Sequence, residues 1–153
     1  MLLILGGIAV ILADQAVKLW VVGNIPVGSA ARELIPGVLS LVCVHNDGAA
    51  FSFLSGGGAR FLFIALALVF VGAVIAAIKT GFIKGRLEHF SLAMIAAGGL
   101  ANCIDRIVYG YVVDMFKVEL FDFAVFNVAD VFITVFTFVF ALKVLFSDTQ
   151  KKA

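Results

Sequence analysis

A lone acid stands in the longest apolar stretch of the C-terminal half of the chain. Asp130 is the only charged residue between positions 123 and 142, and ionisable residues inside such segments are costly and usually mark a function. Asp114, which precedes this stretch, is the best candidate for a second carboxylate. Two carboxylates that share a proton do the chemistry of aspartyl proteases, in which one takes a proton from water while the other polarises the scissile carbonyl.

Other polar residues near the apolar segments have simpler interpretations. Asp14 precedes Lys18 by one helical turn, and Asp105 could pair with the adjacent Arg106 or with Lys18. Each carboxylate could therefore belong to an ion pair or cap a helix. Three interpretations therefore stay open at this point. They are an aspartyl dyad, a proton or ion relay in a small proton-coupled transporter that uses Asp130 and Asp105, and a structural subunit whose polar residues only hold helices together.

The composition indicates that these residues lie in or beside membrane helices. Of the 153 residues, 63% are hydrophobic and 14% are charged, and the mean hydropathy is +1.18, whereas soluble domains are nearer half apolar and a quarter charged. The apolar residues fall in long blocks, which favours helices over the alternating pattern of a membrane barrel. Four blocks approach the ~20 residues that a helix needs to cross a bilayer, at about 2–22, 60–78, 87–107 and 123–146.

The first block shares features with a cleaved signal peptide, because residues 1–13 are uncharged and end in small residues. It lacks a basic n-region, however, and Asp14 and Lys18 interrupt the boundary before the apolar run resumes. We therefore expect a retained first span. We find no internal repeat of the kind that transporters often carry.

The basic residues predict the orientation, since Lys and Arg near span ends are held on the cytoplasmic side. The break at 79–86 contains three basic residues and no acid, and further lysines follow the fourth span. Both termini are therefore expected in the cytoplasm. The long breaks at about 23–59 and 108–122 carry mixed charges and are expected on the extracytoplasmic side.

The first long loop is more than a linker. Residues 38–44 are rich in β-branched side chains and lie between Pro36-Gly37 and a turn-forming segment at 45–48, which is typical of a strand. We predict a single polytopic membrane domain over residues 1–153, mainly α, with four transmembrane helices. The first long loop is expected to form a small extracytoplasmic β-sheet that rests on the membrane.

The expected depths bring the acids together. At about 1.5 Å of rise per residue, Asp14 lies about 20 Å and Asp105 about 27 Å from the cytoplasmic ends of their spans, so both are in the outer half. Span four runs the other way, and Asp130 is expected about 10 Å below an outer start at Phe123. Asp114 follows a turn at 109–111 and is expected at or just outside this layer. Four carboxylates on three elements are therefore expected to lie near one interface.

Two classes of function find no support in the sequence. The net charge of +1 is too small to suggest nucleic-acid binding, and no basic stripe with interleaved aromatics occurs. The two cysteines, Cys43 and Cys103, have no His or Cys neighbour at a metal-ligand spacing. We predict no metal site.

Five segments carry short motifs, in order, along almost the whole chain. They are 14–18 (D-x-x-x-K), 46–52 (N-x-G-A-A-F-S), 98–106 (similar to G-G-x-x-G-N-x-x-D-R), 110–114 (G-x-V-x-D) and 126–130 (F-N-x-A-D). Together they resemble the motifs of the lipoprotein signal peptidases, also called signal peptidase II. Ala101 stands where that family usually has Gly, and Val131 where a Ser is common. Neither departure changes a carboxylate.

The resemblance implies a function. Asp114 and Asp130 would be the catalytic dyad of an aspartic endopeptidase that needs no metal or organic cofactor. Its substrates would be bacterial prolipoproteins with a diacylglyceryl-modified Cys, cleaved just before that Cys at the outer face of the inner membrane. Membrane lipid is the other expected contact, and no obligate protein partner is inferred.

The remaining motif residues receive supporting roles. Asn46 and Asn102 offer amides to substrate backbone, and Arg106 offers a fork of donors to a carboxylate or carbonyl. Gly48 is expected to form a positive-φ turn, and Asn127 to orient Asp130 or to bond a neighbouring helix. The full expected set of substrate-binding or supporting residues is Asn46, Gly48, Asn102, Arg106, Asn127 and Ala129, and the expected structural polar network is Asp14, Lys18 and Asp105.

Overall fold

Four long helices dominate the chain. The computed structural model describes residues 1–48 and 58–150, with side chains through Phe146. Its helices are α1 (Leu2–Asn24), α2 (Gly58–Lys79), α3 (Arg86–Val108) and α4 (Val128–Gln150). Within these residues, four helices are long and apolar enough to cross a membrane. The prediction of a mainly α membrane protein with four transmembrane helices is confirmed. The part of the 46–52 motif after Gly48 lies outside the described residues.

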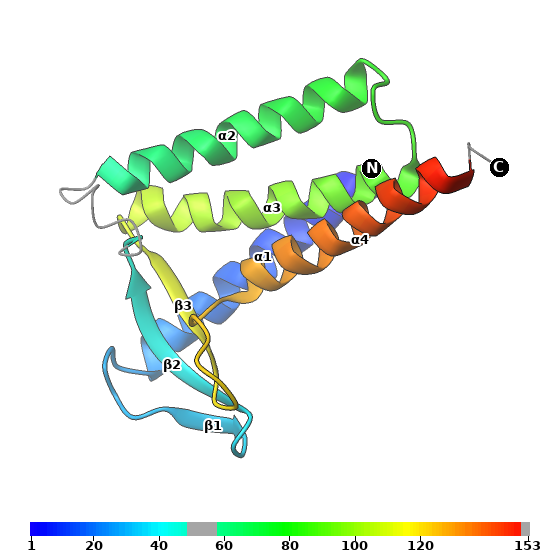
Figure 1. The fold of residues 1–153 in the computed structure, drawn as a ribbon. Coiled ribbons are helices and arrows are strands. Elements are labelled where there is room, and N and C mark those ends of the chain that lie inside the picture. Colours follow the sequence, from blue (N-terminus) through cyan, green and yellow to red (C-terminus); the bar gives the residue numbers. More distant parts are fainter. Residues whose placement is uncertain (49–57, 151–153) are drawn as a thin grey trace.

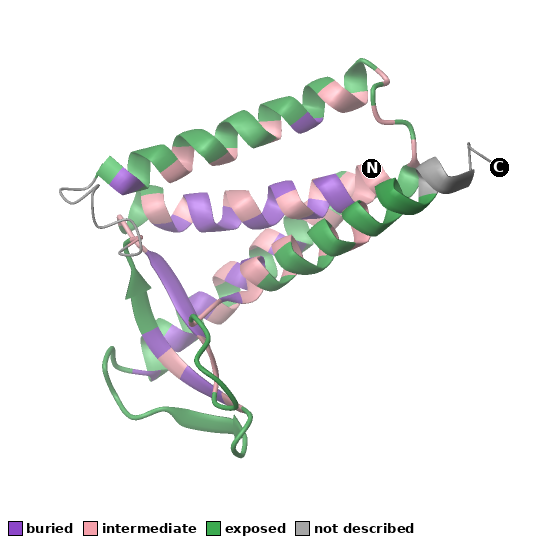
Figure 2. Cartoon of the chain, viewed as in Figure 1, coloured by how far each residue is buried: buried purple, intermediate pink, exposed green. Residues whose placement is uncertain are grey.

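α3 is the central helix. α1 and α4 pack against it and against each other, whereas α2 packs against α3 from the other side (Figure 1). Buried residues are concentrated along α3 and the adjoining strand β3, while most of α2 is exposed (Figure 2). The exposed apolar residues of α2 suit a helix that faces lipid on most sides. The N-terminus and the end of α4 lie at the end of the bundle opposite the sheet.

The sheet differs from the prediction because it recruits both long loops. It consists of β1 (Arg32–Ile35), β2 (Leu39–Asn46) and β3 (Val112–Val118), antiparallel and in the order β1-β2-β3. The sequence predicted a sheet from the first loop alone. β3 comes from the second loop. The two charged residues of this strand interrupt the apolar pattern by which a strand is recognised in a sequence. Asp114 therefore lies on a strand of the sheet.

The start of the fourth helix also corrects the sequence prediction. α4 begins at Val128, whereas the fourth span was predicted to begin at about 123. The reason is that the backbone of Phe126 pairs with Phe116 of β3, in both directions, at N···O distances of 2.8 and 3.1 Å. An apolar run does not reveal such pairing. Asp130 consequently lies in the first turn of α4, nearer the helix end than the predicted depth of about 10 Å.

Apolar contacts join the sheet to the bundle. Val21 of α1 and Ile25, the residue that follows this helix, pack on Val113 and Met115 of β3, and all four are almost fully buried. α1 thus extends beyond the other helices and forms the support on which the sheet rests (Figure 1). The position of Asp114 between Val113 and Met115 follows from this packing, because successive strand residues point to opposite faces.

Gly98 of α3 lies in close contact with α4. A Cβ atom added there would meet the Ala129 carbonyl oxygen and Ile133 Cγ1, each at 2.8 Å. Gly98→Ala is therefore expected to push the helices apart and to cost about 1–3 kcal/mol, the usual range for overpacking. Gly99→Ala is the matched control, since nothing lies within 4 Å of its added Cβ. Thermal melting in detergent should show a lower Tm for Gly98→Ala only; equal Tm values would contradict the packing.

Candidate active site

The strand pairing places Asn46 beside Asp114. Asn46 at the end of β2 is paired with Val112, and its side-chain Nδ2 donates to Asp114 Oδ2 at 2.8 Å. The Gly48 backbone N–H donates to Asn46 Oδ1 at 2.9 Å. Because a backbone N–H can only donate, this bond turns the Asn46 amide so that its NH2 group faces the carboxylate. Asp114 itself is 2% exposed.

Gly48 supports this arrangement through its backbone. Its φ is +87°, in the left-handed region that glycine adopts without strain. An added Cβ would also lie 2.9 Å from Phe63 Cε2 on α2. The structure thus gives Gly48 two reasons to be glycine, a turn and a close contact.

Asp130 is held at the start of α4 by a reciprocal pair of hydrogen bonds. The Asn127 backbone N–H donates to Asp130 Oδ2 at 3.2 Å, and the Asp130 N–H donates to Asn127 Oδ1 at 3.0 Å. This arrangement follows the capping-box pattern, in which the residues that begin a helix satisfy each other's free N–H groups. The other oxygen, Asp130 Oδ1, accepts from Asn102 Nδ2 of α3 at 2.9 Å.

Asn127 links the two carboxylates. Its Oδ1 is committed to the Asp130 N–H, so its Nδ2 faces the other way and donates to Asp114 Oδ1 at 2.6 Å. The same Nδ2 lies 3.1 Å from Asn102 Oδ1. Asn127 is fully buried. Each carboxylate oxygen of Asp114 and Asp130 therefore accepts a hydrogen bond from the protein, which fixes the planes of both groups.

A buried ion cluster lies behind the asparagines. Lys18 Nζ is 2.8 Å from Asp14 Oδ2 and 2.8 Å from Asp105 Oδ2, and the three side chains are at most 3% exposed. Asp14 Oδ1 also accepts from the Ala129 N–H of α4 at 2.8 Å, and Asp105 Oδ2 from the Val113 N–H of β3 at 3.1 Å. The cluster thus ties α1, α3, α4 and β3 together.

Arg106 supplies a second positive charge near Asp114 and Asp130. Its guanidinium packs over the Phe63 ring of α2, 4.6 Å from the centroid, and Nη1 donates to the Asn102 carbonyl at 3.3 Å. Asp114 and Asp130 are both close enough to interact with this charge electrostatically. The stacking on Phe63 is a cation–π contact, which holds the guanidinium without using all its donors.

The two carboxylates open onto one cavity of about 460 Å³, lined also by Asn46. The rest of its lining is largely apolar. Residues 123–126 form one wall, and Val131 and Val135 continue it along α4. The cavity therefore has a polar end that can do acid–base chemistry and an apolar extension that can take up a hydrophobic group.

Comparison with known proteins decides the family. The family model described as signal peptidase (SPase) II matches residues 7–146. This chain belongs to the signal peptidase II family. It is 42% identical over 128 residues to the lipoprotein signal peptidase of Streptococcus thermophilus, which covers 84% of this chain and 82% of that protein. It is 38% identical over 134 residues to the lipoprotein signal peptidase of Latilactobacillus sakei, with 88% and 87% covered.

Solved structures agree with this membership. One described as a bacterial membrane enzyme, determined by the in meso method at 2.3 Å resolution, superposes with a TM-score of 0.83 at 29% identity and covers 99% of this chain and 91% of its own. Another, at 1.9 Å resolution, gives a TM-score of 0.84 at 28% identity, with 94% and 92% covered. The chain is thus a multi-pass membrane protein of a peptidase family, and the family favours the peptidase over the transporter interpretation.

In this member of the signal peptidase II family, the structure brings together the site residues that the sequence predicted. One hydrogen-bond network connects the side chains of Asp114 and Asp130 with the three asparagines and the ion cluster. Gly48 and Ala129 contribute backbone N–H groups to it. Arg106 joins it at the Asn102 carbonyl.

Two members of the site were missed. Gln15 Nε2 donates to Asp105 Oδ1 at 2.7 Å, and Phe63 lies under Arg106. Gln15 occupies an unspecified position of the first motif, although its place one residue after Asp14 in an apolar span was a usable signal. Phe63 is one of 16 phenylalanines, and nothing in the sequence distinguishes it.

Burial raises the pKa of Asp114 above that of an ordinary aspartate, and the negative charge of Asp130 raises it further. Hydrogen bonds from Asn46 and Asn127 act in the opposite direction, because they favour the ionised form, but burial prevails. The folded protein therefore binds this proton more tightly than the unfolded chain. Its contribution to stability falls as the pH rises from the ordinary aspartate pKa through the raised one.

Asn46→Ala is expected to raise the pKa of Asp114 still more, since it removes a donor to the ionised carboxylate. Carboxyl ¹³C NMR of aspartate-labelled protein across a pH series would measure this, with Asp114→Asn used to assign the signal. Asn24→Ala is the matched control, because that amide is exposed and bonds only the Trp20 carbonyl among the described residues. An unchanged or lower pKa in Asn46→Ala would contradict the geometry.

Proposed function

We propose that this chain is an aspartic endopeptidase that removes signal peptides from diacylglyceryl-modified prolipoproteins, with Asp114 and Asp130 as the catalytic pair. One observation carries the proposal. The two carboxylates come from different elements, are bridged by the amide of Asn127, and line the same cavity. The family membership supports a signal peptidase, and the carboxylate pair supports the aspartic mechanism.

The chemistry follows from one shared proton. The ionised carboxylate takes a proton from water as the water oxygen attacks the scissile carbonyl carbon, and the protonated carboxylate donates to the carbonyl oxygen. The tetrahedral intermediate then collapses, the C–N bond breaks, and the leaving amine takes up a proton from the pair. The raised pKa of Asp114 favours retention of the shared proton by the pair.

The surrounding amides suit this cycle. Neutral donors from Asn46, Asn102 and Asn127 hold the carboxylates without adding charge to an apolar environment. Each carboxylate oxygen retains a lone pair for water or for the proton. Arg106 offers a positive charge near the oxyanion that develops in the transition state.

The cavity and its depth support a lipidated substrate. Asp130 is in the first turn of α4, and Val131 and Val135 extend the cavity along that helix. A Cys that carries two acyl chains beside the scissile bond would bring its peptide to this level and its lipid to the apolar wall. A dyad at midplane would instead suit substrates cut within the membrane.

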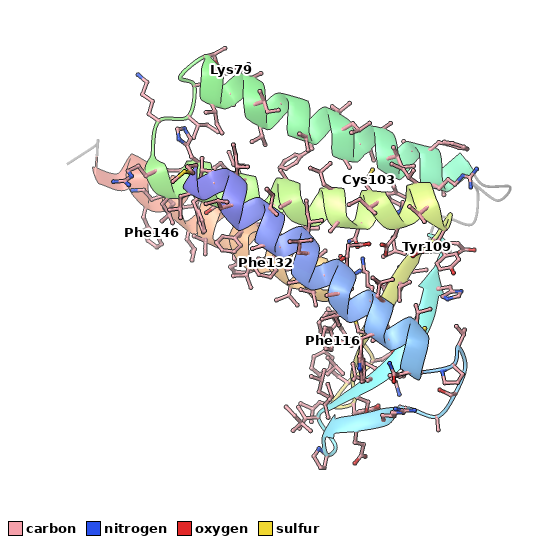
Figure 3. The ribbon with its side chains drawn as sticks, turned by 180° about the vertical axis from the view of Figure 1, so that it is seen from behind. Lys79, Cys103, Tyr109, Phe116, Phe132 and Phe146 are labelled. Atoms are coloured by element: carbon pink, nitrogen blue, oxygen red, sulfur yellow. The ribbon has the colours of Figure 1, made fainter. Side chains whose placement is uncertain are left out.

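We also infer the orientation. The sheet is at one end of the bundle, with Tyr109 and Phe116, while Lys79 and Phe146 are at the other (Figure 3). The two carboxylates are at the sheet end, because Asp114 is on β3 and Asp130 is in the first turn of α4. The basic residues of the short break between α2 and α3 favour the cytoplasm at their end. Both termini are then cytoplasmic, and the dyad faces the outer side of a bacterial inner membrane.

Asp114→Asn and Asp130→Asn are each expected to reduce kcat by about 10³-fold or more, because an amide neither takes up nor shares the proton. Asparagine is near-isosteric with aspartate, so both variants should still fold. Their Tm in detergent should be somewhat lower than that of the wild type, because the asparagine NH2 group faces a donor that the carboxylate oxygen accepted from. Asp122→Asn is the control, since Asp122 is exposed. Normal turnover by either dyad variant would refute the mechanism.

A purified enzyme assay with paired precursor peptides tests the substrate. One peptide carries the diacylglyceryl group on its Cys and the other has a free thiol. We expect cleavage just before the lipidated Cys and at least about tenfold lower kcat/KM for the unmodified peptide, equivalent to about 1.4 kcal/mol of lost transition-state binding. Equal rates would remove the lipid requirement. No cleavage of either peptide, together with proton flux in liposomes that Asp130→Asn abolishes, would favour a transporter.

A further inference from the structure

We propose that Lys18 is a positioning residue for the dyad, because it sets the orientation of the Asn102 amide that holds Asp130. This inference rests on the proposed function. The buried ion cluster then has a second role in addition to holding the helices together.

All three hydrogens of the Lys18 ammonium have partners. Two point to Asp14 Oδ2 and Asp105 Oδ2, and the third is donated to Asn102 Oδ1 at 2.8 Å. An ion cluster needs only the two carboxylates to compensate its cation. The third bond leads out of the cluster, toward the dyad.

The direction of that bond determines the amide. A lysine ammonium can only donate, so the Asn102 oxygen must face Lys18 and the NH2 group must face the opposite way. There the NH2 group donates to Asp130 Oδ1 at 2.9 Å. A flipped amide would set its own hydrogens against the ammonium and would present an oxygen to the carboxylate.

Asn127 assists with a weaker restraint. Its Nδ2 also donates to Asn102 Oδ1, at 3.1 Å, but that donor is neutral and its shorter bond, at 2.6 Å, is to Asp114. Charge-assisted hydrogen bonds are roughly twice as strong as neutral ones. Lys18 is therefore the main determinant, and its loss should weaken the orientation of Asn102 without abolishing it.

The charge of Lys18 also reaches the dyad. The titratable and charged groups around the pair are Asp14, Asp105, Lys18 and Arg106, and Lys18 lowers the pKa of Asp114 against the stronger effect of burial. Removal of this cation favours the protonated forms. Both limbs of the pH profile of kcat/KM should then move to higher pH.

The experiment compares Lys18→Met with wild type on a lipidated precursor peptide. We expect kcat to fall about tenfold, as expected for a loosened hydrogen bond at the reacting carboxylate, with KM changed less than about twofold and both pH limbs shifted upward. Lys117→Met is the matched control. It removes the same charge from β3, the strand of Asp114, but Lys117 is 45% exposed and pairs with Glu119, so its profile should equal that of the wild type.

Lys18→Met leaves two buried acids without their cation and could fail to fold. The double variant Lys18→Met/Asp105→Asn covers this case, since it removes one charge of each sign and leaves the formal charge of the cluster unchanged. The fall in kcat should persist in it, because Asn102 still lacks the lysine donor. A purely structural lysine would lower Tm and leave the kcat and pH profile of the folded fraction at wild-type values, which would overturn the proposal.

The failure of this inference can be told apart from failure of the dyad. Asp130→Asn is inactive if the proposed function holds, whatever Lys18 does. A wild-type profile in folded Lys18→Met or in the double variant overturns the role of Lys18 alone.

Discussion

The rest of the site depends on the contacts of the Lys18 ammonium, which is buried among two carboxylates and an amide. A charge removed from water is costly, and breaking a buried pair by removal of one partner is more costly than never having formed it. The cluster is compensated only when α1 and α3 pack together, and its acids also bond the first turn of α4 and the strand β3. Docking of the helices and of the sheet is therefore coupled to one set of charges.

The helices could be predicted because the bilayer imposes their length and because long apolar blocks with few charges are typical of membrane spans. Asp130 stood out for the same reason, as a charge where charges are costly. The start of α4 could not be predicted, since Phe126 belongs by composition to the span but by hydrogen bonding to β3. Asp114 took its role in the sequence from its motif and its expected layer; its place in a sheet depends on pairing with β2, a contact between distant segments that local pattern does not encode.

The site combines a rigid strand and a helix start, two kinds of backbone with different free groups. A strand presents side chains on alternating faces, so the neighbours of Asp114 can pack on α1 while the carboxylate faces the cavity. A helix start presents free N–H groups, and Asp14 and Asp130 accept hydrogen bonds from them. Asparagine is the common adaptor between them, because one amide offers an acceptor to the helix and donors to the strand at once.

The division of the dyad between β3 and α4 has a consequence for biosynthesis. The chain emerges from the ribosome N-terminus first, so a nascent protein with three inserted helices already contains Asp114 but lacks the residue that would share its proton. Asn127, which bridges the two, is also absent at that stage. Under the proposed mechanism, a partly made chain has no means of hydrolysing the precursors that surround it, and proteolytic competence arrives only when the last span joins the others.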